Sequence, residues 1–351
     1  MAYTTIDDPS AFFKVQLYTG DGGTNAITFD DTDTTMQPDF VWIKNRDATD
    51  SHMWFDSVRG VTKRLSSNSV NGEVTDADTL TAFGSDGFTV GADVKVNTNT
   101  EKYVAWCWKA GTTSGIATNA STDITPAGYS FNATSGISIV IWDPSGSTVE
   151  QIPHGLGVAP QWINNKHYNA DGGSWKGYHV IVDATDFVKI GEDSAREDTD
   201  ILWGDTEPDS VNFTTGTYYA SGAYYISYLF APVKGFSKFS SFTGNGNADG
   251  PFVYTGFRPA MVIIKRIDST GAWYMYDNKR PGYNGTNGYV QADAYSAEDT
   301  NVGNFDLDIL ANGFKPRGTY AALNASGGTF IYAAFAEAPF VNSEGVPCNA
   351  R

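Results

Sequence analysis

Cysteine is scarce in this sequence, and so are the residue patterns that hold metals. Only Cys107 and Cys348 occur among 351 residues. Disulfide-dependent secreted proteins use more cysteines at regular spacings, so we expect two free thiols, with Cys107 buried in its apolar run. The four histidines lie far apart and form no His-x-His or His-Glu-x-x-His pattern. No metal or cofactor is therefore expected.

Basic residues are also few, with 23 Lys and Arg against 40 Asp and Glu and a net charge of −17. Binding to nucleic acid or to an anionic lipid surface needs a basic face, so we expect neither partner. No run approaches the roughly 20 apolar residues of a membrane span, and no membrane insertion is expected. The first residues lack the basic and apolar regions of a signal peptide, which predicts synthesis in a cytoplasm.

Catalytic motifs are missing from the chain. It contains no Gly-x-Ser-x-Gly elbow, no phosphate-binding loop with its lysine and no dinucleotide fingerprint. We therefore expect a protein that is not an enzyme. A glycosidase needs only two suitably spaced carboxylates, and with 40 acidic residues the sequence leaves that alternative open.

Aromatic residues and glycine are abundant, at 14% of the chain and 37 residues respectively. Together with many Ser, Thr and Asn residues, this composition predicts a loop-rich, all-β protein.

A hairpin pattern recurs along the chain. Residues 38–56 and 259–277 each begin with a proline. A lysine follows six positions after the proline, and an aspartate follows eighteen positions after it. Apolar, β-branched and aromatic residues fill both runs, which predicts two strands and a turn. A looser copy starts at Pro160. Each copy is followed by an aromatic strand, so the repeat unit is about a hundred residues, the size of a small domain.

The repeat predicts three tandem, related β-sandwich domains of lectin-like or jelly-roll type. We expect the Gly- and Thr-rich linker to give the first unit more freedom than the other two. The predicted boundaries are a lead-in at 1–12, repeat 1 at 13–111, a linker at 112–128, a diverged repeat 2 at 129–235, repeat 3 at 236–340 and a tail at 341–351.

Charged residues also recur at fixed places in the hairpins. We interpret them as cross-strand ion pairs that fix the register, in preference to three equivalent active sites. The acidic segment 30–35 is interpreted as a solvated loop, with a calcium site as the alternative, because the full EF-hand pattern is absent. The recurring residues are Lys44, Lys166 and Lys265, and Asp56, Asp183 and Asp277.

Several aromatic residues lie in or beside Gly- and Asn-rich turns. A flat exposed ring can stack on a sugar while neighbouring Asp and Asn side chains bind its hydroxyls, although a chain this aromatic also needs rings for ordinary packing. The candidates for glycan contact are Trp54, Trp175, Trp273, Tyr283 and Tyr289.

The amino-acid sequence of several segments resembles a repeat found in structural proteins of marine tailed bacteriophages. The resemblance lies in residues 1–11, 17–20, 37–46, 55–60 and 103–109 of the first unit, and in 242–246, 256–259 and 332–337 of the third. It implies a virion component, commonly a tail fibre or tail protein, with lectin-like β-sandwich units. It brings no catalytic residues.

From the resemblance we expect a non-enzymatic structural protein of the virion, made in the host cytoplasm. We expect it to be a tail fibre or receptor-binding component that contacts host-surface polysaccharide. Other virion proteins are the expected partners, with a homo-oligomer inside the particle. The alternatives are a capsid decoration or head-fibre protein, and a glycan depolymerase.

Overall fold

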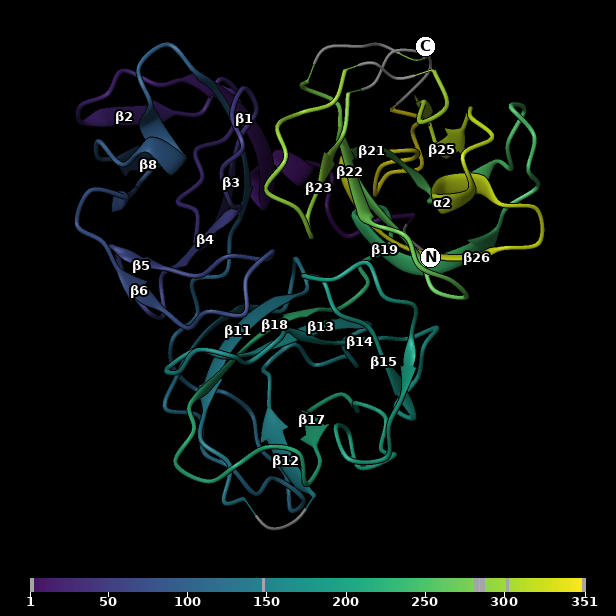
Figure 1. Ribbon diagram of the computed structural model, residues 1–351. Helices are drawn as coiled ribbons and strands as arrows, with labels where there is room; N and C mark the ends of the chain where they lie inside the picture. The colour runs from purple at the N-terminus through teal and green to yellow at the C-terminus, as the bar shows by residue number, and fades with distance from the viewer. Residues whose placement is uncertain (1–2, 147–148, 281–283, 285–287, 301–302, 349–351) are drawn as a thin grey trace.

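The chain folds into antiparallel β-sheets grouped in three lobes around a common centre (Figure 1), and the prediction of an all-β sandwich fold is confirmed. This computed structural model describes residues 3–146, 149–280, 284, 288–300 and 303–348. We define lobe 1 as residues 13–108, lobe 2 as 128–230 and lobe 3 as 237–339.

Lobe 1 pairs a four-stranded sheet with a smaller one. The main sheet has the order β1 (Phe13–Thr19), β9 (Lys102–Trp108), β3 (Phe40–Asn45) and β4 (Met53–Asp56). The smaller sheet contains β2 (Asn25–Thr28), β8 (Gly87–Val90) and β7 (Leu80–Gly84). Short elements complete the region, namely η1 (Pro9–Ala11), β5 (Lys63–Arg64), β6 (Val74–Thr75) and α1 (Val94–Asn97).

Lobe 2 has a five-stranded main sheet. Its order is β10 (Gly128–Asn132), β11 (Ile137–Trp142), β18 (Tyr225–Phe230), β13 (Trp162–His167) and β14 (Lys176–His179). Two ribbons accompany it, one of β12 (Glu150–Pro153) with β17 (Asn212–Thr215), the other of β15 (Asp186–Phe187) with β16 (Glu197–Asp198).

Lobe 3 repeats the arrangement of lobe 1. Its main sheet has the order β19 (Ser237–Thr243), β26 (Thr329–Pro339), β21 (Phe257–Arg266), β22 (Trp273–Asp277) and β23 (Val290–Gln291). The smaller sheet contains β20 (Val253–Tyr254), β25 (Gly313–Pro316) and β24 (Leu307–Leu310), and α2 (Ala321–Asn324) precedes the last strand.

The three main sheets share one strand order. The shared order is β1-β9-β3-β4 in lobe 1, β11-β18-β13-β14 in lobe 2 and β19-β26-β21-β22 in lobe 3. In each case the last strand of the lobe lies between an early strand and the first strand of the hairpin. The register also matches, because Phe40 lies opposite Trp108, Trp162 opposite Phe230 and Met261 opposite Phe335. Positions in the lobes can therefore be equated residue by residue.

The main sheet of lobe 1 is buried on both faces. Successive side chains of a strand point to opposite faces. In β3, Phe40 and Trp42 join the cluster at the centre of the molecule, while Val41 and Ile43 join the core between the two sheets of lobe 1. This is why the strand is apolar throughout instead of alternating.

Equivalent rings from the three lobes meet at the centre. We call Trp108, Phe230 and Phe335 the central rings; their centroids lie 5.9, 5.6 and 5.3 Å apart in the three pairs. Lobe 1 also contacts lobe 2 through Trp54 and Trp175, whose centroids are 4.6 Å apart. The expectation that the first unit has more freedom than the other two is wrong, because the rings of lobe 1 are part of a core shared by all three lobes.

Three buried histidines bind main-chain groups in their neutral form, His52 and His179 across a boundary between lobes and His154 within lobe 2. His52, His154 and His179 are at most 1% exposed. In each, Nε2 lies beside a backbone carbonyl, of Gln291, Asp209 and Tyr332 respectively, while Nδ1 accepts a hydrogen bond. A proton on Nδ1 would remove that acceptor, and burial lowers the pKa of His154 and His179 to about 4.

We predict that His179 makes the fold sensitive to acid. The folded ring stays neutral down to about pH 4, whereas the unfolded ring binds a proton below about pH 6.5. The unfolded state therefore holds more protons in this window, so the free energy of unfolding falls as the pH falls, by about 1–2 kcal/mol for this group between pH 7 and 5.

Urea unfolding of the wild type and His179→Gln at both pH values measures this effect. The variant should lose about 1–2 kcal/mol less than the wild type on acidification. Asp293 is common to both proteins; burial raises its pKa to about 6, so its effect has the opposite sign and cancels in the comparison. An equal loss in both proteins would show that His179 is not the acid-sensitive group.

Candidate functional site

In each lobe, a segment that follows the hairpin makes hydrogen bonds to another lobe: lobe 1 to lobe 2, lobe 2 to lobe 3, and lobe 3 to lobe 1. We call residues 66–73, 189–196 and 291–298 the interlobe loops; they start one position after equivalent bridges in the three lobes. A main-chain N–H near the end of each loop donates to a carbonyl of the next lobe. The bonds are Glu73 to Tyr168 at 2.6 Å, Arg196 to Ile267 at 3.0 Å and Glu298 to Arg46 at 2.9 Å.

Three of the predicted glycan-contact rings have structural roles in these junctions. The indole N–H of Trp175 donates to Ser66 O at 2.9 Å, and that of Trp273 donates to Lys189 O at 2.7 Å, so each holds an interlobe loop. Trp54 packs against Trp175 in the central core. All three are at most 3% exposed, so the prediction that they are exposed is wrong.

The fourth candidate, Tyr289, does not form a surface platform either. Tyr289 is 7% exposed, and its ring packs on Phe305 with centroids 4.8 Å apart while its hydroxyl donates to Asp299. Its predicted exposure is also wrong. Tyr283 lies outside the described residues. The physical reason for these errors is shared: turns that looked peripheral in the sequence are covered by a neighbouring lobe or loop.

The recurring lysines and aspartates do not form cross-strand pairs. In an antiparallel hairpin the two residues lie at opposite ends, since Lys265 is opposite Trp273 and Asp277 is opposite Met261. Each lysine instead donates to a carbonyl of an interlobe loop. The acceptors are Tyr295 O at 3.3 Å from Lys44, Val70 O at 2.9 Å from Lys166 and Asp193 O at 2.9 Å from Lys265.

Burial gives these lysines an unusual protonation equilibrium. Loss of hydration lowers the pKa of Lys44, Lys166 and Lys265 to about 8 in each case. A lysine with such a pKa can act as a nucleophile in other settings. Here each ammonium group is buried and donates a hydrogen bond to a main-chain carbonyl of an interlobe loop. The recurring lysine therefore stabilises these loops.

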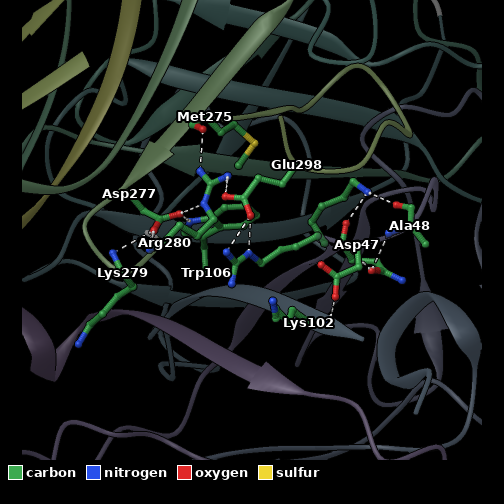
Figure 2. Close-up of polar contacts among 12 residues, drawn as sticks. Asp47, Ala48, Lys102, Trp106, Met275, Asp277, Lys279, Arg280 and Glu298 are labelled. Atoms are coloured by element: carbon green, nitrogen blue, oxygen red, sulfur yellow. Dashed lines mark hydrogen bonds and ion pairs between the residues drawn. The ribbon is translucent and has the colours of Figure 1, made fainter. Parts of the chain in front are cut away.

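The junction of lobes 1 and 3 contains a buried charge network (Figure 2). Arg280 donates from Nε to Asp277 at 2.6 Å and from Nη2 to Met275 O at 2.7 Å, and it pairs with Glu298 at 3.3 Å. Trp106 of lobe 1 donates to Asp277 at 3.3 Å. These side chains are almost fully buried, and each charge has a partner, so the network fits a structural role.

The acidic segment 30–35 is held by a lysine of β1. Lys14 Nζ donates to Thr34 O at 2.6 Å and to Asp31 O at 3.2 Å, and it pairs with the Asp31 carboxylate at 3.6 Å. The segment is thus bound by an ammonium group, through two carbonyls and one carboxylate. Among the described residues, no group of three or more His, Cys, Asp or Glu side chains is placed to hold a metal ion.

An open groove of about 620 Å³ lies beside lobe 3, within the size range of ligand sites. We call it the tyrosine groove. Its lining includes two lysines and no carboxylate. Tyr3 and Tyr254 are 56% and 53% exposed, the large accessible rings that a surface ligand needs. The lining residues are Tyr3, Pro232, Lys234, Gly235, Ser237, Lys238, Tyr254, Thr255, Gly256, Phe340 and Val341.

Local backbone geometry shapes this groove. Gly235 has a φ of +79°, and a Cβ there would lie 2.7 Å from Thr4, so glycine lets the segment carrying Tyr3 approach. Thr4 Oγ1 then donates to Lys234 O at 2.9 Å and fixes that segment. Lys234 Nζ lies 5.5 Å from the centre of the Tyr3 ring, and Lys238 Nζ lies 5.3 Å from that of Tyr254.

Comparison with known proteins places the chain in a family. A family model described as a domain of unknown function (DUF7483) matches residues 8–339. The chain belongs to this family. The comparisons with curated proteins and with solved structures found no match. The DUF7483 match spans all three lobes, so the family unit includes the interlobe loops and the lining residues of the tyrosine groove between positions 232 and 256.

The tyrosine groove of this DUF7483 chain was missed in the sequence. Phe252 and Tyr254 are exposed on either side of buried Val253, but all three residues are apolar or aromatic, so the sequence shows no alternation there. Tyr3 and Lys234 carry no signal either, because only the fold brings them beside this strand. Within the described residues, no helix has the length and apolar character needed to cross a bilayer.

Proposed function

We propose that the protein is a non-enzymatic structural component of a phage particle, carried on the tail as a fibre or receptor-binding element. In this proposal the tyrosine groove contacts host-surface glycan, and other virion proteins hold the chain in the particle as a homo-oligomer. The proposal draws on the resemblance of its segments to a repeat of marine phage structural proteins. The interlocked lobes support it, since they provide a rigid scaffold for surface attachment.

The observation that carries the glycan proposal is the pair of exposed tyrosine rings in an open groove. The face of a sugar ring presents C–H groups that pack on a phenol ring, and tyrosine offers this area at a low cost in conformational entropy. Ser237 and Thr255 also line the groove, but both are buried and their hydroxyl groups donate to Ala231 O and Phe257 O, so the exposed rings carry the proposal.

A depolymerase is less well supported by this geometry. The tyrosine groove has no carboxylate among its lining residues, whereas glycosidases use two. A separate cleft of about 330 Å³ is lined by four acidic residues, Asp30, Asp31, Asp33 and Glu337. Glu337 pairs with Arg258 at 2.8 Å, and Asp31 pairs with Lys14 at 3.6 Å. Partial burial disfavours the charge of Asp31, but hydrogen bonds from Asp33, Ser10 and Lys14 outweigh burial and lower its pKa. A general acid needs the opposite shift.

We predict that Tyr254→Ala weakens glycan binding about tenfold, because truncating a central aromatic contact costs more than about 1 kcal/mol of binding free energy. Binding of both proteins to a microarray of neutral and acidic glycans measures this. Tyr295→Ala is the matched control, since Tyr295 is 62% exposed and does not line the groove. Equal binding by wild type and Tyr254→Ala would exclude the groove as the glycan site.

One observation favours a capsid decoration or head-fibre protein as a second candidate. The three lobes surround a common centre (Figure 1), and an equivalent main-chain hydrogen bond and an equivalent lysine recur at all three junctions, so one chain could face three similar subunits around a local threefold axis of a shell. Cryo-EM reconstruction of intact particles separates the two candidates. Density on the tail supports the receptor-binding role, and density over the head shell supports decoration.

A further inference from the structure

The charge of the tyrosine groove is opposite to that of the whole molecule. The chain has a net charge of −17, yet the groove lining has Lys234 and Lys238 and no carboxylate. Carboxylates that are near in sequence are engaged elsewhere. Asp7 accepts from Ser343 N–H at 2.7 Å, and Glu337 pairs with Arg258 at 2.8 Å. The groove is therefore a local positive site on an acidic protein.

Each ammonium group is placed beside an exposed ring. Lys234 and Lys238 lie over Tyr3 and Tyr254 at 5.5 and 5.3 Å from the ring centroids, which are favourable cation–π distances. Lys238 Nζ donates to Tyr254 O at 2.7 Å and so uses one of its three N–H donors. A sugar that stacks on either ring would bring its substituents close to an ammonium group.

From this geometry we infer that the tyrosine groove selects acidic glycans, whose sugar rings stack on Tyr3 and Tyr254 while carboxylate or sulfate groups pair with Lys234 and Lys238. The inference rests on the proposed glycan-binding function and names its ligand class. Away from the groove, the net negative charge of the protein repels an anionic polysaccharide. Recognition must therefore come from the groove, which makes the binding selective.

Three polymers with one backbone test the inference, namely dextran, carboxymethyl dextran and dextran sulfate, titrated calorimetrically into the full chain. We expect the two anionic polymers to bind at least about tenfold more tightly than dextran, and this preference to shrink in 0.5 M salt. The double variant Lys234→Gln/Lys238→Gln should lose the preference while it keeps the weak binding of dextran.

The matched control is Lys102→Gln/Lys279→Gln, which changes the net charge equally at two exposed positions outside the groove. It should bind like the wild type; an equal loss in both double variants would overturn the inference, because the effect would then follow total charge. Equal binding of all three polymers, dependent on Tyr254, would overturn the preference for acidic glycans and leave the glycan-binding function standing. Binding of none of these polymers, together with no binding on the glycan microarray, would overturn both proposals.

Discussion

Replacing Arg280 with methionine should lower the free energy of unfolding by about 3–5 kcal/mol. The side chains of Arg280 and Asp277 are 1% and 0% exposed, and their ion pair is 2.6 Å long. Methionine fills much of the arginine volume but leaves the Asp277 carboxylate buried without its cation, and Glu298 loses one of its two arginine partners. The cost of an unpaired buried charge is the main reason for the size of the effect.

Chemical denaturation of wild type, Arg280→Met and a control measures this loss. Arg317→Met is the control, because the Arg317 side chain is 41% exposed and its ion pairs with Asp249 and Asp308 are on the surface. We expect the control to lose less than about 1 kcal/mol. A loss below about 1 kcal/mol for Arg280→Met as well would mean that the junction of lobes 1 and 3 is open to water.

The strands were predictable because local patterns determine them. The runs after Pro38 and Pro259 do form β3 and β21, and the aromatic runs that end the copies form β9 and β26. Residue types that favour strands, with turn formers between them, carry enough information at this level. The looser middle copy also gives a hairpin, β13 with β14.

The burial of the aromatic side chains beside the turns could not be predicted from turn composition alone. Trp54 was expected on the surface because it lies beside a polar turn, whereas it is buried between lobes. One signal was available in principle: the segment from Phe40 to Ile43 is apolar at every position, and a strand with one wet face would alternate. A strand without alternation indicates a second buried face, here supplied by the other lobes.

The polar side chains at the junctions depend on contacts between distant parts of the chain. Lys265 contacts Asp193 and Lys166 contacts Val70, and no local pattern pairs these residues. The recurring lysine was visible, but its carbonyl partners come from an adjacent lobe. The tyrosine groove has the same origin, since Tyr3 and Tyr254 are far apart in sequence. Local sequence patterns thus indicated the strands and hairpins, whereas the chain topology determines which side chains meet at the junctions between lobes.

Shared burial at the centre leads to the last prediction: Phe335→Ala should lower the free energy of unfolding by about 3–5 kcal/mol. Phe335 is 1% exposed and contacts Trp108 of lobe 1 and Phe230 of lobe 2. Its removal leaves a cavity that borders all three lobes. Because no lobe can keep its central face buried alone, we expect the whole chain to unfold in one transition that moves as a unit.

Guanidinium unfolding followed by both tryptophan fluorescence and far-UV circular dichroism tests this coupling. The two signals should coincide in wild type and in Phe335→Ala, with the midpoint of the variant shifted to lower denaturant. Phe252→Ala is the control, since Phe252 is 50% exposed and the same truncation there should cost little. Separate transitions, of which only one shifts in Phe335→Ala, would show that the lobes are stable independently and that the central rings join domains already folded.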